Sequence, residues 1–163
     1  MTARRILFIL LAIVTTSGMS CGPSLVEVLI ECPSPDRKLF AVVWAEVVGV
    51  GASAQELVSI RPGDVPMARQ QDRRGGELSP VLTVNSAASA FALRWEGNNR
   101  LLITVTYPDR ATVSQIAERR TIRGRPVDVA YQEVKIDRPF MTTKAACESD
   151  GRRIEDPLPR RLR

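Results

Sequence analysis

The amino-acid composition is that of one small globular domain that contains no histidine. The chain has 163 residues, a formal net charge of +5, three cysteines and 44% hydrophobic residues, which is neither a disordered nor a fibrous composition. The lack of histidine excludes Ser-His-Asp and Cys-His catalysis and any histidine-ligated metal site. Three cysteines cannot form a Cys₄ zinc site within one chain. We therefore expect no catalytic residues of these kinds, no metal and no cofactor.

The first twenty residues have the pattern of a secretory signal peptide. Arg4 and Arg5 precede an apolar run over residues 6–14, and small and polar residues follow up to Ser20. This is a charged segment, a short hydrophobic segment and a weakly polar one. Nine apolar residues are too few to span a bilayer core, which needs about 20. A buried N-terminal helix or strand is the alternative.

A cysteine follows this segment directly, in Ser17-Gly18-Met19-Ser20-Cys21. The arrangement resembles the lipobox of bacterial lipoproteins, although Gly18 replaces the usual leucine and Met19 is bulky for its position. The resemblance implies that Cys21 carries a lipid anchor, with residues 21–25 as a tether and the membrane as a partner. Ordinary cleavage nearby, giving an exported protein without an anchor, is the alternative.

Removal of residues 1–20 also changes the charge. It removes two arginines and no acidic residue, so 21 basic residues remain against 18 acidic ones and the net charge falls to +3. No basic stripe with interleaved aromatic residues is present, and we expect no nucleic-acid partner.

The first half of the remaining chain predicts a series of strands. Residues 25–31 are rich in β-branched side chains, and Pro33, Pro35 and Asp36 then indicate a turn. Residues 38–50 carry apolar residues on both faces and predict a central strand, with residues 56–60 as its hairpin partner. Apolar residues have no regular spacing over residues 63–79, which predicts a flexible surface loop.

The strongest structural pattern is the alternation over residues 90–107. Apolar residues occupy every second position on both sides of Gly97-Asn98-Asn99. This pattern predicts a β-hairpin with Trp95 on its core face. Residues 112–122 and 127–136 predict a second hairpin, although a helix over residues 113–120 is possible. The apolar residues of the second arm change from one face to the other, which predicts a bulge or a strong twist near Gln132.

The chain after residue 139 loses this pattern. We expect residues 148–163 to form a disordered tail whose terminal basic cluster could touch anionic envelope components. The ordered part is then one β domain over residues 26–147. Its fold class is all-β, a small antiparallel sandwich or rolled sheet built from hairpins.

Two cysteines remain once Cys21 is assigned to lipid. An exported domain occupies a compartment where disulfides persist, so we expect Cys32 to pair with Cys147. Two free thiols are the alternative.

One acidic residue has an unusual position in the pattern. Glu46 lies among apolar residues of the predicted central strand. A buried carboxylate there would need a partner, and Arg94 is a plausible one. A solvated Glu46 near the strand end is the alternative.

Several short motifs in sequence order resemble a group of small uncharacterised bacterial exported proteins. Residues 34–44 read SPDRKLFAVVW, residues 58–63 read VSIRPG, and residues 93–95 and 101–108 read LRW and LLITVTYP. Arg37 stands where that group has glycine. The first motif is also similar to single blades of TolB-like β-propellers, but the chain is too short for a propeller. The resemblance implies hairpins and assigns no functional residue.

These observations predict an exported cell-envelope lipoprotein that is a non-enzymatic binding or structural module. Its expected partners are the membrane, through Cys21, and an envelope protein or polyanion. The alternative is a small exported hydrolase or a protein that neutralises a secreted toxin, and a hydrolase would need a pocket lined by at least two acidic residues.

Overall fold

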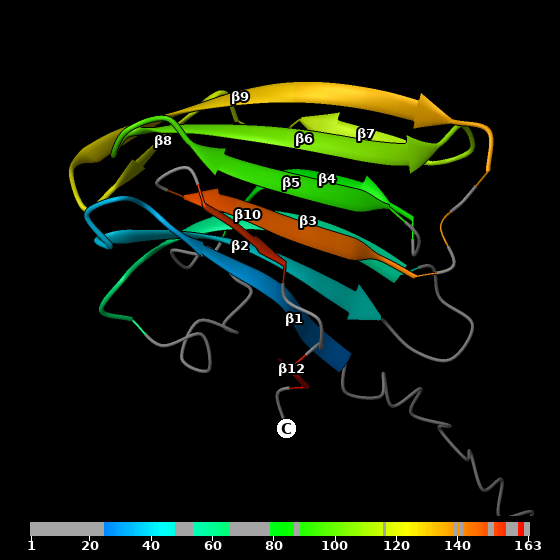
Figure 1. Cartoon of the computed structure of the whole chain (residues 1–163), viewed down its shortest axis with the longest axis horizontal. Helices are drawn as coiled ribbons and strands as arrows, with labels where there is room; N and C mark the ends of the chain where they lie inside the picture. The colour runs from blue at the N-terminus through cyan, green and yellow to red at the C-terminus, as the bar shows by residue number, and fades with distance from the viewer. Residues whose placement is uncertain are drawn as a thin grey trace, which may run out of the picture.

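Two six-stranded sheets pack face to face in the computed structural model (Figure 1). The structure describes residues 25–47, 54–65, 79–86, 89–115, 117–138, 140, 142–149, 152–155 and 160–161. The predicted signal peptide, Cys21 and most of the predicted 63–79 loop lie outside these residues. No helix within the described ranges is long and apolar enough to cross a membrane. The predicted all-β sandwich is confirmed.

The strands divide between the sheets as follows. The first sheet has the order β12 (Arg160–Arg161), β1 (Leu25–Pro33), β2 (Leu39–Val47), β3 (Ala54–Pro62), β4 (Pro80–Asn85) and β7 (Thr112–Gln115). The second sheet has the order β11 (Arg152–Glu155), β10 (Lys144–Ser149), β5 (Ala90–Trp95), β6 (Arg100–Pro108), β9 (Arg125–Ile136) and β8 (Arg119–Ile122).

The first sheet is antiparallel and has β2 among its central strands, as the sequence predicts. Val43 of β2 pairs with Val58 of β3, and both side chains are fully buried in the core between the sheets. Val42, the preceding residue of β2, points to the outer face and is also fully buried. Burial on both faces explains why this strand lacks a polar face.

The second sheet is mixed, because β10 pairs with β5 and β6 pairs with β9 in parallel. The predicted hairpin of residues 90–107 is present as β5 and β6. Trp95 is 5% exposed, and its Nε1 donates to the carbonyl oxygen of Cys32 across the sandwich at 3.0 Å. Trp95 is therefore a core residue, as predicted.

The second predicted hairpin is only partly correct. Residues 112–115 and 119–122 are strands rather than the alternative helix, but they belong to different sheets as β7 and β8. Only β8 pairs with β9, through a turn at Arg123 and Gly124, whose φ angles are 50° and 78°. Two successive left-handed residues are typical of a two-residue hairpin turn.

The sequence predicts a bulge or a strong twist near Gln132, and the bulge is wrong. The β6–β9 register runs without a shift from Asp128 to Ile136. The apolar parity changes because Val134 lies on the outer face and is 39% exposed. Register shifts lie instead between Val28 and Ile30 in β1 and between Val58 and Ser59 in β3.

The predicted disordered tail also needs correction, because strands β11 and β12 lie within residues 148–163. β11 pairs with β10, and β12 pairs with β1 at Glu27 and Val28. Both short strands add to strands already fixed in the sheets, so they need no hydrophobic run of their own. This is why the polar sequence gave no strand signal.

The predicted disulfide between Cys32 of β1 and Cys147 of β10 is confirmed. Their Cα atoms are 5.3 Å apart and both residues are fully buried. The bond joins the two sheets and closes a sequence separation of 115 residues.

Replacing both Cys32 and Cys147 by alanine should lower the free energy of unfolding by up to about 4–5 kcal/mol, because the unfolded chain gains the entropy of an open loop. Urea denaturation of the oxidised protein and of the double variant measures the difference. The reduced wild-type protein should behave like the variant, and a loss below about 1 kcal/mol would show that the bond constrains little.

Candidate functional site

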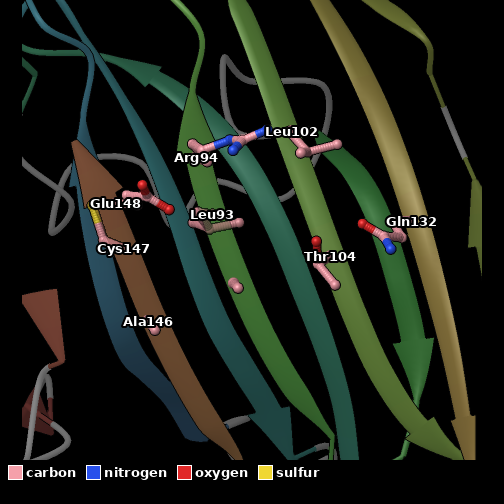
Figure 2. Close-up of a pocket in the computed structure, with 9 residues that line it drawn as sticks. Leu93, Arg94, Leu102, Thr104, Gln132, Ala146, Cys147 and Glu148 are labelled. Carbon is pink, nitrogen blue, oxygen red and sulfur yellow. The ribbon is translucent and has the colours of Figure 1, made fainter. Parts of the chain in front are cut away.

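A shallow groove crosses the exposed outer face of the second sheet (Figure 2). Its volume is about 240 Å³, and Ala92 and Ala146 are among the residues that line it. The polar side chains in the figure lie on four different strands and do not converge on one point. The Arg94 guanidinium forms an ion pair with the Glu96 carboxylate at 2.8 Å. Among the described residues that line it, the groove has no concentrated charge of one sign and no cluster of polar groups that could orient a ligand.

A second depression lies at the β8–β9 edge of the same sheet and holds two acidic residues. It measures about 590 Å³ and is lined by Arg100, Glu118 and Asp128, among others. Asp128 accepts a bond of 2.6 Å from Arg119, and this bond lowers the pKa of the carboxyl. A hydrolytic carboxylate pair needs one member with a raised pKa as the acid. The ion pair at Asp128 works against that role.

A third depression, the end cleft, lies where loops of both sheets meet. It measures about 410 Å³. The first sheet contributes the turn between β1 and β2 and the turn after β3, and the second sheet contributes the β8–β9 turn. The lining residues are Arg37, Lys38, Leu39, Pro62, Gly63, Asp64, Ile122, Arg123 and Arg125. Four of these nine residues are cationic and one is acidic, so the cleft is basic.

Asp36 holds the loops beside the end cleft together. Its Oδ1 accepts from the Ser34 hydroxyl at 2.7 Å, and its Oδ2 accepts from Arg125 of β9 at 2.8 Å. The backbone N–H of Asp36 donates to the side-chain oxygen of Asn98 in the β5–β6 turn at 3.0 Å. One residue of the first sheet thus bonds to two segments of the second.

These contacts also determine the charge of Asp36. Desolvation alone would raise the pKa of its carboxyl, but the bonds from Ser34, Arg125 and the Lys38 backbone N–H outweigh it and lower the pKa to about 2. Asp36 is therefore ionised at neutral pH and holds Arg125 in place.

The turn after β3 approaches the β1–β2 turn very closely. The N–H of Gly63 donates to the carbonyl of Lys38 at 2.7 Å. A Cβ atom on Gly63 would lie 2.4 Å from the carbonyl oxygen of Arg37, so only glycine fits without a backbone shift. Below this turn, the nearly buried Arg61 donates to the carbonyls of Pro62 and Val65.

Two of the cleft arginines have left-handed backbones. The φ angles of Arg37 and Arg123 are 56° and 50°, a region that non-glycine residues adopt at some cost. Arg123 donates to Asp64 at 2.6 Å. In the part of the chain that the structure describes, neither the Arg37 nor the Lys38 side chain has a carboxylate partner, and both residues are exposed.

A buried carboxyl lies at the opposite end of the sandwich. Glu56 of β3 is fully buried and accepts a bond from Thr143, which precedes β10. Burial raises its pKa, although hydrogen bonds from Thr143 and Ser89 act in the opposite sense. No solvent-filled depression described above reaches Glu56, so it joins β3 to the starts of β5 and β10 and does not serve the end cleft.

The residues selected from the sequence have different places. Cys21 lies outside the described residues, and Cys32 and Cys147 form the disulfide. Glu46 is 8% exposed, so it is not the solvated residue of the alternative interpretation. The predicted Glu46–Arg94 pair is wrong, because these side chains lie on the outer faces of different sheets and Arg94 bonds to Glu96.

The cations of the end cleft were missed by sequence reasoning. Arg37 and Arg123 stand 86 positions apart and each looks like an ordinary turn residue. The only one of these cations that the sequence analysis singled out was Arg37, as an arginine within the Ser-Pro-Asp turn. Among the described residues, no group of three or more cysteine, aspartate or glutamate side chains is placed to hold a metal ion.

Comparison with known proteins finds no matching protein family, no matching curated protein and no matching solved structure.

Replacing Asp36 by asparagine should lower the free energy of unfolding at neutral pH. It should also make this free energy depend less on pH below about pH 4. Because folding lowers the pKa of Asp36 to about 2, its contribution is full above pH 4 and is lost as the pH falls towards 2. The free energies of unfolding of wild type and variant should therefore converge between about pH 4 and pH 2.

Urea denaturation at a series of pH values gives this curve. Asp137→Asn, at an exposed position just after β9, is the matched control and should follow the wild type. A constant difference between Asp36→Asn and wild type across the whole range would contradict the role of the Asp36 carboxylate.

Proposed function

We propose that this protein is an exported bacterial cell-envelope lipoprotein, anchored through Cys21, that acts as a non-enzymatic binding module. The end cleft is its binding surface. The observation that carries the proposal is the placement of this basic cleft at the end of the sandwich opposite to the start of β1.

The strand directions support this arrangement. β1 begins at Leu25 and ends at Pro33, beside the β1–β2 turn that lines the cleft (left side of Figure 1). Nine residues of strand span roughly 26–30 Å. Cys21 precedes Leu25 by four residues, which reach at most about 14 Å. An anchor on Cys21 would therefore leave the cleft facing away from its membrane.

The disulfide is consistent with export. A buried Cys32–Cys147 bond is usual in proteins that mature in an oxidising compartment and rare in the cytosol. The hydrolase alternative has one observation in its favour, the depression lined by Glu118 and Asp128. The hydrogen bond from Arg119 lowers the pKa of Asp128 and works against its acting as the acid. No specific observation among the described residues favours the toxin-neutralising partner.

A photo-crosslinking amino acid in place of Asp64 tests this function in intact cells. It should give a discrete adduct with an envelope component, because Asp64 is exposed and lines the end cleft. The matched control carries the same group in place of Thr104, on the outer face of the second sheet.

The adduct at position 64 should require the anchor. Cys21→Ser should abolish both lipid labelling and the adduct. Equal adducts from positions 64 and 104, or an unchanged adduct in the Cys21→Ser protein, would contradict the proposal.

A further inference from the structure

We infer that the end cleft binds an acidic segment of a protein partner, with carboxylates on Arg37 and Lys38 and an apolar side chain against the cleft wall. This inference rests on the proposed function and adds the chemistry of the partner.

The charge balance of the cleft is the first argument. Arg123 and Arg125 are matched by Asp64 at 2.6 Å and by Asp36 at 2.8 Å. Within the described ranges, Arg37 and Lys38 have no such partner and remain exposed. Two adjacent, uncompensated cations on one rim create a local positive potential that attracts carboxylates.

The position of Arg37 is the second argument. Its φ of 56° is one that glycine adopts without strain and arginine does not. The turn is held in this shape by the Arg37 N–H bond to the Ser34 carbonyl at 2.8 Å and by the Lys38 carbonyl, which accepts from Gly63. The Arg37 guanidinium is thus presented from a hydrogen-bonded turn in a strained backbone conformation, and such conformations cluster at binding sites.

The wall of the cleft distinguishes between anionic partners. Leu39, Pro62 and Ile122 line the cleft beside the cations, and a peptide can place an apolar side chain there. A dense phosphate polymer has no apolar groups and would gain nothing from this wall. Alternating acidic and apolar side chains match both features.

The test is a titration of the full-length protein in neutral detergent with a short capped peptide that alternates glutamate and leucine. Fluorescence anisotropy should show binding that weakens with added salt, and the glutamine counterpart of the peptide should not bind. Arg37→Gly should weaken binding roughly tenfold while leaving the melting temperature equal or higher, because glycine relieves the left-handed strain.

Matched variants and competitors complete the design. Lys38→Ser should also weaken binding roughly tenfold, whereas Arg94→Ser, in the outer groove, should not change it. Unchanged binding by folded Arg37→Gly, or equal binding of the glutamine peptide, would overturn the inference.

Two other anions test the class of partner. Inorganic polyphosphate or phosphatidylglycerol vesicles that displace the peptide and bind more tightly would overturn the choice of an acidic protein segment. The envelope adduct at position 64 would stand in that case, so failure of the inference and failure of the proposed function can be told apart.

Discussion

The covalent bond between Cys32 and Cys147 fixes the two sheets relative to each other. It joins β1 to β10, and the carbonyl of Cys32 also accepts the indole N–H of Trp95 from β5. Both contacts are buried, so one residue of the first sheet is attached to two strands of the second. A sandwich held by apolar packing alone could slide or open more easily at this edge.

The end cleft depends on this attachment because it is built from both sheets. The turn that carries Asp36, Arg37 and Lys38 starts directly after β1, within a few residues of Cys32. Arg123 and Arg125 come from the second sheet. The Asp36–Arg125 and Asp64–Arg123 pairs then join the loops across the sheet boundary. Exposed ion pairs contribute little stability, and here their main effect is to orient the arginines.

Local patterns in the sequence predicted the parts of the fold that local interactions determine. The β5–β6 hairpin follows from alternation and a Gly-Asn turn, and β2 follows from its two apolar faces. The Cys32–Cys147 pairing was predicted from compartment and cysteine number. The assignment of β7 and β8 to different sheets was not predictable, because the local pattern of residues 112–122 does not determine which strands these residues pair with.

The candidate site was predicted poorly for a related reason. Its cations come from turns far apart in the sequence, and only the strand order brings Arg37 beside Arg123. A charged site of this kind depends on the order of the strands in the sheets and not on a local sequence motif. The strands of the tail, β11 and β12, likewise depend on neighbours already in place.

Chemical-shift mapping of the isotope-labelled protein during titration with the acidic peptide tests the central claim most directly. The account predicts that the backbone amides of Arg37, Gly63 and Arg123 shift together and saturate at one affinity. Shifts concentrated instead at Arg94, Gln132 and Glu148, on the outer face of the second sheet, would contradict the claim that the end cleft is the binding surface.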